Sequence, residues 1–333
     1  MAQNHELSAG KRERLRRMTN ADGVIAALAI DQRGAMKKLI GKYKEPTTED
    51  IVEFKKLVST ELTKYTSAIL LDPEYGLPAS SLRDPSCGLL IAYERTGYDA
   101  TVAGRLPDLL VNWSVRRLKE AGADAVKFLL YYDPEEGDKI NDQKKAFVER
   151  IGSECAAEEM PLFVELVTYD AGTTGLNGAD PKSAEYAAMK PGKVIEATRE
   201  FSDPRYGVDV LKLEVPVNMA FVEGFTSEGV EPVYTEAQAA EYFKQQSDAT
   251  NLPFIFLSAG VSADLFRKTL RFAKRAGSTF NGVLCGRATW ADGVAEFAKG
   301  GEKAALEWLE NQGRKNVEEL NETLAQTATG IEL

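Results

Sequence analysis

A lysine and a glutamate interrupt the otherwise apolar segment VDVLKLEVPVN, residues 208–218. A lysine is costly to bury unless another group pairs with it or the protein uses it chemically. Alternate side chains of a strand point to opposite faces, so Lys212 and Glu214 share one face and Leu211 and Leu213 the other. The segment therefore predicts a buried strand with one apolar face and one chemically active face.

Three further charged residues sit in, or at the end of, similar apolar runs: Asp31 in VIAALAID, Lys127 in DAVKFLLYY and Glu165 in PLFVELV. If the two lysines lie close together, each ammonium disfavours protonation of the other, and burial acts in the same direction. An uncharged amine attacks carbonyl carbons and forms a Schiff base, which stabilises a carbanion at the adjacent carbon. A nearby carboxylate can move the protons. The set predicts Schiff-base catalysis.

A buried salt-bridge network that only sets strand register is the alternative interpretation. Such networks rarely add net stability, whereas clustered charges are typical of catalytic sites. The only histidine is His5, and the three cysteines (Cys87, Cys155 and Cys285) fit neither a disulfide framework nor a zinc site. We therefore expect no metal and no cofactor.

Two glycine-containing turns, in FLSAGVSADLF and VLCGRATW, indicate a phosphate site. Gly260 and Gly286 allow the backbone to approach a ligand, while Ser258 and Arg287 supply donors, and an arginine can bind phosphate bidentately. Barrels often bind phosphate with the loops after strands seven and eight.

The elements that would position these residues are eight apolar runs separated by segments with helical spacing. This order favours one α/β domain over residues 1–333, a (β/α)8 or TIM barrel. We expect a helical extension over 1–20 whose basic run KRERLRR is solvated, a helix over 263–277 ending at Gly277, and a C-terminal helix and tail over 315–333. GLPASSLRDPSC is predicted to be loop. The runs are 24–31, 67–72, 88–93, 124–132, 161–167, 208–215, 253–260 and 280–287.

The face of each strand is chosen so that its charged residues point into the lumen. For the last two strands this choice places Phe256, Ser258, Val283, Cys285 and Arg287 inside, and Ile255, Leu257 and Leu284 toward the helices. Two acidic loops are given structural roles. Asp72 and Glu74 are interpreted as loop capping, and Glu94 is expected to pair with its neighbour Arg95.

The chain has 333 residues, 44% of them hydrophobic, and a formal net charge of −10. The acidic balance argues against nucleic acid as a partner. No apolar run of membrane-spanning length and no secretory leader is evident, so we expect a cytoplasmic protein with no membrane partner. Barrels of this kind often pair, which predicts a homo-oligomer, a dimer or a tetramer.

Long stretches of the sequence closely resemble the class I tagatose 1,6-bisphosphate aldolases, in order, from about Met18 to the C-terminus. The resemblance implies a (β/α)8 barrel in which the strand-six lysine, here Lys212, forms the Schiff base. It also implies active-site roles for Asp31, Gln32, Lys127, Glu165, Ser258 and Arg287. Segment 170–191 departs from the family pattern in length and composition, and we expect it at the rim of the site. The stretches are ALAIDQRGAMKKL, SAILLDPEYGLPAS, GRLPDLLVNWSVRRLKEAGADAVKFLLYYD, RIGSECAAEEMPLFVELVTYD, VDVLKLEVPVN, LSAGVSADLF and FNGVLCGRATW.

The resemblance implies cleavage of tagatose 1,6-bisphosphate, and of epimeric ketohexose 1,6-bisphosphates, to dihydroxyacetone phosphate and glyceraldehyde 3-phosphate, as in lactose and galactose catabolism. Lys212 would attack C2, Glu165 would move protons, Lys127 would disfavour protonation of Lys212, and Asp31 would orient the amines. Ser258, Gly260, Gly286 and Arg287 would hold the C1 phosphate, with Arg33 a candidate for the second phosphate. A Schiff-base aldolase for a sulfonated or monophosphorylated ketose and a non-catalytic sugar-phosphate sensor are the alternatives.

Overall fold

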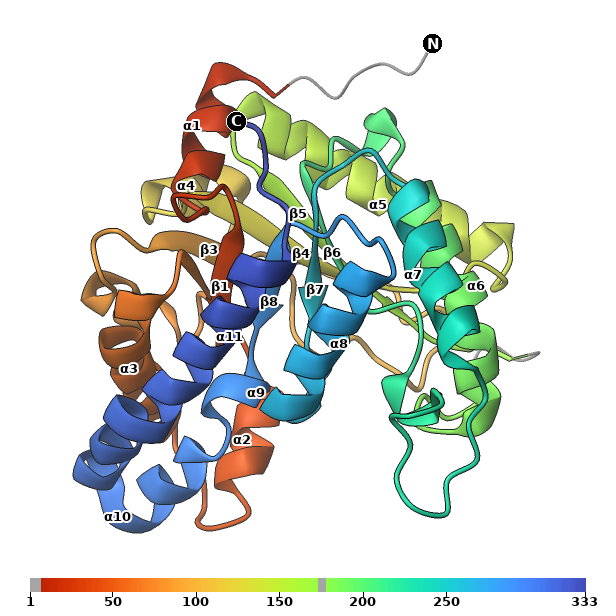
Figure 1. Ribbon diagram of the computed structural model, residues 1–333. Coiled ribbons are helices and arrows are strands. Elements are labelled where there is room, and N and C mark those ends of the chain that lie inside the picture. Colours follow the sequence, from red (N-terminus) through yellow and green to blue (C-terminus); the bar gives the residue numbers. More distant parts are fainter. Residues whose placement is uncertain (1–6, 173–177) are drawn as a thin grey trace.

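Eight parallel strands close into a barrel in chain order, β1-β2-β3-β4-β5-β6-β7-β8 (Figure 1). The computed structural model describes residues 7–172 and 178–333. Each predicted run coincides with one strand to within a few residues, so the prediction of a (β/α)8 barrel is confirmed. The strands are β1 (Ile25–Ala29), β2 (Ala68–Leu71), β3 (Gly88–Ala92), β4 (Ala125–Tyr132), β5 (Leu162–Thr168), β6 (Val210–Leu213), β7 (Phe254–Leu257) and β8 (Gly282–Cys285).

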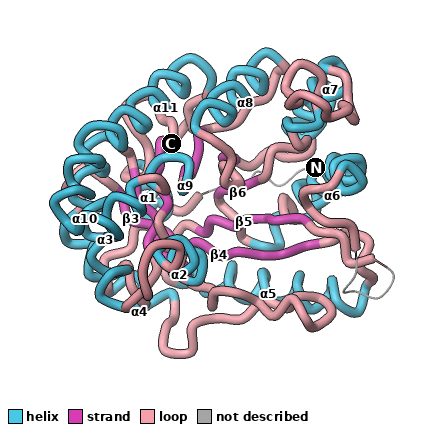
Figure 2. Tube along the Cα trace, turned by 90° about the horizontal axis from the view of Figure 1, so that it is seen from below, coloured by secondary structure: helices cyan, strands magenta, loops and turns pink. Residues whose placement is uncertain are grey.

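Helices surround the barrel, as the view in Figure 2 shows. The predicted C-terminal helix is α11, which packs beside α8. The predicted loop between β2 and β3 contains a short 3-10 helix, Leu77–Leu82. The α-helices are α1 (Ala9–Arg16), α2 (Gly34–Ile40), α3 (Thr48–Leu62), α4 (Val115–Glu120), α5 (Asp138–Ala157), α6 (Ala184–Glu200), α7 (Glu236–Asp248), α8 (Ala263–Arg275), α9 (Arg287–Trp290), α10 (Gly293–Trp308) and α11 (Arg314–Thr327).

The α8 helix shows why these segments form helices where they do. The Ser262 hydroxyl accepts the N–H of Leu265 at 3.2 Å and caps the first turn. Gly277 follows the last turn with a φ of +83°, a left-handed conformation that glycine adopts without strain. The predicted end of this helix at Gly277 is thereby confirmed.

The α1 helix closes one end of the barrel, so the predicted basic helix is solvated on one side only. Lys11 is buried and its Nζ lies 2.7 Å from the Asp209 carboxylate. Leu15 and Met18 are fully buried among the apolar residues of the lumen. These three residues are spaced four and three apart and therefore share one face of the helix. The many charged residues around them make this face hard to recognise in the sequence. Figure 1 places α1 and the C-terminus at one end and α2 and α9 at the other.

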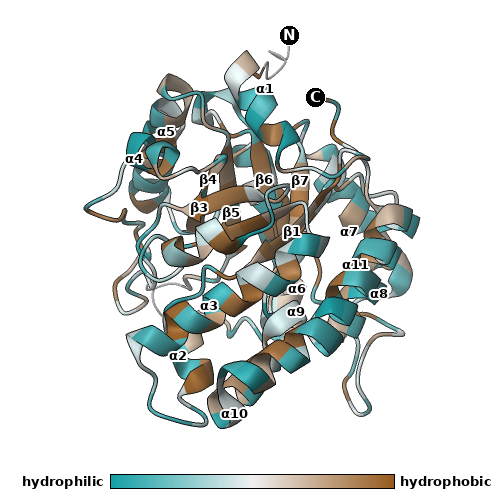
Figure 3. Ribbon diagram, turned by 90° about the vertical axis from the view of Figure 1, so that its left-hand side faces the viewer, coloured by the Kyte–Doolittle hydropathy of each residue, from teal (hydrophilic) through white to brown (hydrophobic). Residues whose placement is uncertain are grey.

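The core has two layers, one inside the barrel and one between strands and helices, and Figure 3 shows the apolar strands enclosed by helices with hydrophilic outer faces. The predicted faces of β1, β4, β5 and β6 are confirmed, since Ala27, Ala125, Phe163 and Val210 pack inside. The faces of β7 and β8 are the reverse of those predicted. Their inner residues are Ile255 and Leu284, and their outer residues are Phe256, Val283 and Cys285.

The error on β7 and β8 has a backbone cause. Both faces of these strands are apolar, so the choice of face depended on polar residues beyond their ends. Ala259 and Gly260 follow β7 with φ of 49° and 76°, and Gly286 separates β8 from Arg287 in non-helical geometry. Strand alternation does not continue through such turns.

In the described ranges, none of the helices combines the length and apolar character needed to cross a membrane.

Candidate active site

Glu165 joins the two lysines at the centre of the barrel. Its Oε1 lies 2.9 Å from the Nζ of Lys212, and its Oε2 lies 2.8 Å from the Nζ of Lys127. The strand register explains this contact, because Glu165 is directly opposite Lys212 on the neighbouring strand. The predicted lysine pair is therefore brought together through one shared carboxylate.

Lys127 lies among three carboxylates. Besides Glu165, its Nζ contacts Asp31 Oδ2 at 3.1 Å and Glu94 Oε1 at 2.6 Å. Burial by itself would lower the pKa of Lys127, but the charges of Asp31, Glu165 and Glu94 outweigh it and raise the pKa well above its ordinary value. Lys127 is therefore a fixed ammonium, while Lys212 has one carboxylate partner within the described part of the chain.

Glu94 is a site residue that sequence reasoning missed. It was expected to pair with Arg95, but Arg95 contacts Asp108 at 3.3 Å and Glu94 turns inward. Ala92 pairs in register with Lys127, and Glu94 follows Ala92 by two residues, on the same side. The alternation of Leu90, Ala92 and Glu94 was the signal that could have placed Glu94 in the lumen.

Asp31 and Glu165 are held in their ionised forms. For each, burial raises the pKa, but the positive charges of Lys127 and Lys212 oppose it and leave the pKa below its ordinary value. Glu165 is therefore ionised at neutral pH and can accept a proton, and the amine of Lys212 lies within hydrogen-bond distance of it.

The five side chains of the cluster differ in how much of each is exposed to solvent. The side chains of Lys127 and Glu94 are 1% and 3% exposed. Those of Lys212, Glu165 and Asp31 are 5%, 12% and 13% exposed. A molecule entering the barrel would therefore meet these last three groups, with Lys127 and Glu94 supporting them from below.

Glu214 does not join this cluster, contrary to the predicted lumen set. One of its carboxylate oxygens accepts the N–H and the hydroxyl of Thr168, each at 2.8 Å, and the other lies 3.2 Å from Lys190 Nζ. The β6 strand ends at Leu213, so alternation no longer governs the direction of Glu214. Glu214 therefore leaves Lys212 to Glu165.

The predicted phosphate residues gather beside the ends of β7 and β8. The Arg287 guanidinium lies against Gly260, where an added Cβ would be 2.8 Å from Nη2. An added Cβ on Gly286 would lie 3.3 Å from the amide nitrogen of Gln32. Within the described residues no carboxylate lies in salt-bridge range of Arg287, which is exposed. This edge of the mouth therefore presents a free guanidinium between two glycines.

Ser258 and Arg33 are differently engaged. The Ser258 hydroxyl hydrogen bonds to the thiol of Cys285, whose pKa burial raises to about 12. Arg33 is buried, with its guanidinium 2.5 Å from Glu74 and donating at 3.0 Å to the carbonyl oxygen of Glu94. Both residues are near the mouth and already have protein partners, although the Nε of Arg33 is buried without a hydrogen bond.

The acidic loop after β2 has the capping role that was predicted for it. Asp72 accepts the N–H of Tyr75 at 2.8 Å and forms a fully buried ion pair with Lys55. Its neighbour Glu74 instead pairs with Arg33.

The predicted rim segment 170–191 includes residues 173–177, which lie outside the described residues. At its start Asp170 accepts the N–H of Ala179 at 2.7 Å, and at its end the α6 helix begins at Ala184.

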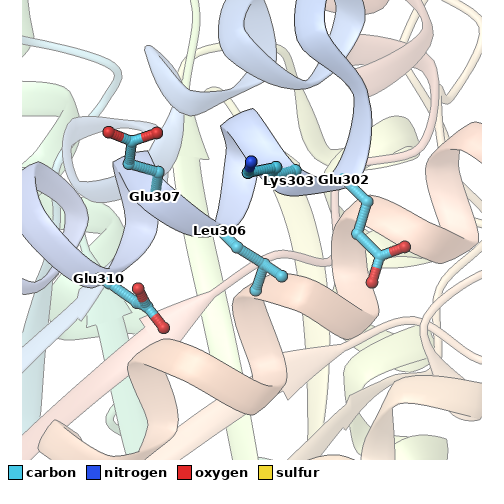
Figure 4. A pocket seen from close by; sticks show the side chains of 5 residues that line it. All are labelled: Glu302, Lys303, Leu306, Glu307 and Glu310. Atoms are coloured by element: carbon cyan, nitrogen blue, oxygen red, sulfur yellow. The ribbon is translucent and has the colours of Figure 1, made fainter.

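A hollow on the outer side of α10 lies apart from these residues (Figure 4). Three of its five lining residues are glutamates, so its charge would repel a phosphorylated ligand. None of the candidate site residues lines it. Its lining consists of Glu302, Lys303, Leu306, Glu307 and Glu310.

The chain is similar to known aldolases. The model of the DeoC/LacD family of aldolases matches residues 25–292. "Tagatose 1,6-diphosphate aldolase 2" of Enterococcus faecalis is 62% identical over 324 residues, 97% of this chain and 96% of that protein. "Tagatose 1,6-diphosphate aldolase" of Staphylococcus aureus (strain JH9) is 58% identical over 317 residues, 95% of each chain.

Solved structures share the fold at low sequence identity. Fructose-bisphosphate aldolase from Plasmodium falciparum superposes with a TM-score of 0.70 at 19% identity, covering 98% of each chain. A Schiff-base-forming fructose-1,6-bisphosphate aldolase gives a TM-score of 0.53 at 17% identity, covering 93% of this chain and 99% of the other. The family match spans most of the barrel, and the close relatives are similar over nearly their whole length. The chain therefore belongs to the DeoC/LacD family of aldolases.

Proposed function

We propose that this aldolase cleaves tagatose 1,6-bisphosphate, and epimeric ketohexose 1,6-bisphosphates, through a Schiff base on Lys212. The observation that carries the proposal is the shared carboxylate: Glu165 contacts the amines of both Lys212 and Lys127. The substrate is the one named for the Enterococcus and Staphylococcus relatives, which are 62% and 58% identical.

The geometry supports the following sequence of steps. Lys212 passes a proton to Glu165, and its free amine attacks C2 of the open-chain ketose to give a carbinolamine. Glu165 protonates the carbinolamine hydroxyl, water leaves, and an iminium forms. Glu165, ionised again, accepts the proton of the C4 hydroxyl as the C3–C4 bond breaks, and the bonding electrons move into the iminium to give an enamine. Glyceraldehyde 3-phosphate departs, and protonation at C3 followed by hydrolysis releases dihydroxyacetone phosphate.

The other residues of the cluster hold this machinery in place. The ammonium of Lys127 positions Glu165 and Asp31, and its surplus of carboxylate contacts keeps it charged throughout. Asp31, 13% exposed, is suited to bind a substrate hydroxyl. We assign the C1 phosphate to Gly260, Gly286 and Arg287, with Gln32 and the backbone near Ser258 beside it. Arg33 lies toward the other end of the substrate.

Borohydride trapping tests the Schiff base. Borohydride added with dihydroxyacetone phosphate should reduce the iminium and attach the triose covalently to Lys212, as peptide mapping would show. Lys212→Met should abolish both trapping and turnover while leaving the circular dichroism spectrum unchanged. Lys190→Met, which removes another buried lysine outside the cluster, serves as the matched control and should still be trapped. An adduct on Lys127 would contradict the assignment of the nucleophile.

Substrate range is tested with a panel of ketoses. Steady-state kinetics with tagatose, fructose, psicose and sorbose 1,6-bisphosphates, a ketose monophosphate and a sulfonated ketose should favour the bisphosphates. Preference for a sulfonated or monophosphorylated ketose would support the neighbouring aldolase activity instead. Binding without cleavage would support a sensor.

We also propose that the enzyme acts in the cytoplasm as a homo-oligomer. Its three described cysteines are buried free thiols, which fits a reducing compartment. Light scattering of the purified protein, coupled to size-exclusion chromatography, would test the oligomeric state.

A further inference from the structure

Arg105 reaches the mouth of the barrel from the connection between β3 and α4. Its guanidinium carbon lies 3.7 Å from the centre of the Tyr131 ring. Tyr131 is on β4, four residues beyond Lys127 and therefore on the same, lumen-facing side. The half-buried side chains of Leu129 and Tyr131 mark where this wall opens to solvent. Arg105 thus lies over the C-terminal end of β4, where barrel active sites are built.

The guanidinium of Arg105 has no anionic partner among the described residues. In residues 7–172 and 178–333, no carboxylate lies within salt-bridge range of it, and its Nε is buried without a hydrogen-bond partner. Arg95 and Arg33 each have a carboxylate partner, Asp108 and Glu74, although the Nε of Arg33 is also buried without a hydrogen-bond partner. A buried donor on a charged group is unfavourable unless something satisfies it. The described residues therefore leave the guanidinium charge of Arg105 uncompensated, which suits it to an anionic ligand.

The backbone supports the same conclusion. Gly104 and Arg105 have consecutive left-handed conformations, with φ of 92° and 42°. Such a conformation is unfavourable for arginine and is typical of residues held in place for ligand contact. The turn directs Arg105 onto Tyr131, and the Tyr169 ring lies 5.5 Å from the same guanidinium carbon.

Barrel topology places Arg105 across the mouth from Arg287. In the closed strand order β4 lies four strands from β8 in either direction, and β6, which carries Lys212, lies two strands from each. Both arginines lack a carboxylate partner among the described residues. A ketohexose bisphosphate has a phosphate at each end. With its C1 phosphate at Arg287 and C2 on Lys212, its far end points toward the wall that holds Arg105.

We propose that Arg105 binds the C6 phosphate of the ketohexose bisphosphate, the phosphate that leaves with glyceraldehyde 3-phosphate. This inference rests on the proposed function. With Tyr131 against one face of the guanidinium, its two Nη groups can contact phosphate oxygens bidentately. Arg105 is then the residue that selects bisphosphates over 1-phosphates.

The synthetic direction isolates this contact, because dihydroxyacetone phosphate carries only the C1 phosphate. Condensation is measured with glyceraldehyde 3-phosphate and with unphosphorylated glyceraldehyde as acceptors. Arg105→Gln should lower kcat/KM for the phosphorylated acceptor about 10- to 100-fold, the range for a charged hydrogen bond, and leave the other acceptor unchanged. Arg105→Lys should recover part of the loss. Arg95→Gln, from the same connection, should behave as wild type for both acceptors.

Borohydride trapping separates the possible failures. Trapping of dihydroxyacetone phosphate on Lys212 should be equal in wild type and Arg105→Gln, which also shows that the variant folds. Absence of trapping in the wild type would overturn the proposed function and the role of Arg105 with it. Intact trapping with no loss, or an equal loss for both acceptors, would overturn the role of Arg105 alone. If Arg105→Gln does not fold, Arg105→Lys and Tyr131→Leu give the same selectivity comparison.

Discussion

Replacing Lys127 with methionine removes the ammonium that three buried carboxylates share. The Nζ of Lys127 lies 2.6 Å from Glu94, 2.8 Å from Glu165 and 3.1 Å from Asp31. Methionine has a similar length and no charge, so the variant keeps most of the packing and leaves the carboxylates facing one another. Removing one partner of a buried ion pair costs about 3–5 kcal/mol, and we expect a loss of this size in the free energy of unfolding near neutral pH.

The pH dependence of this loss follows from the lowered pKa values of Asp31 and Glu165. Burial raises both pKa values, and Lys127 is the largest influence that lowers them. A carboxylate whose pKa is lowered in the folded protein stabilises the fold above its ordinary pKa, and this contribution disappears as the pH falls. Lys127→Met removes that contribution. Its deficit relative to wild type should therefore be largest near pH 7 and shrink toward about pH 4, where the carboxylates of the variant take up protons.

The same change should alter the reaction. Without Lys127 the pKa of Glu165 rises, so the acid limb of the kcat/KM profile should move to higher pH. Trapping at Lys212 should persist. Urea unfolding at a series of pH values and a pH–rate profile provide the two measurements. Lys55→Met is the matched control, because it breaks a fully buried ion pair with Asp72 outside the cluster, and it should lose stability without moving the acid limb.

Two results would refute this reasoning. One is a Lys127→Met variant as stable as wild type near neutral pH. The other is a deficit of equal size at pH 4 and pH 7, which would mean that the loss comes from packing rather than from the unpaired carboxylates.

Three further predictions concern the proposed chemistry. Glu165→Gln should lower kcat by 10²–10⁴-fold with KM largely retained, the usual contribution of a general acid or base, whereas Glu214→Gln should stay close to wild type; activity of Glu165→Gln within a few-fold of wild type would favour Glu94 or Asp31. Arg287→Ala should weaken binding of phosphorylated ketoses by about 1.5–3 kcal/mol in a titration, and equal weakening of an unphosphorylated ketose would contradict a phosphate contact. Prolonged chelation should leave the steady-state rate unchanged, and a loss that zinc restores would argue against the Schiff-base mechanism.

The sequence determined the barrel and most of the charged cluster in its lumen. Eight apolar runs, each followed by a polar or helical segment, permit few other folds. Each of the strands β4, β5 and β6 has one charged residue among apolar ones. Only one choice of face places Lys127, Glu165 and Lys212 in the lumen, where they can pair with one another, rather than against the helices. For these strands the energetic penalty of a misplaced charge made the assignment unique.

Where the alternation of apolar and polar residues gives no information, the tertiary structure determined the arrangement. Both faces of β7 and β8 are apolar, so pairing with neighbouring strands alone put Ile255 and Leu284 inside. Lys11 and Leu15 are buried because α1 packs against one end of the barrel. The basic composition of this segment gave no indication of that packing.

The tertiary structure also determined which charged and aromatic residues meet. Glu94 prefers a lysine on the next strand to the arginine beside it in the chain, since strand register brings Lys127 within 2.6 Å while Arg95 turns toward Asp108. Arg105 meets Tyr131 across 26 residues of sequence only because the chain between them folds back over the strand ends. The local sequence pattern predicts the face of a helix or strand on which a residue lies. Contacts between loops and strands depend instead on the closure of the barrel.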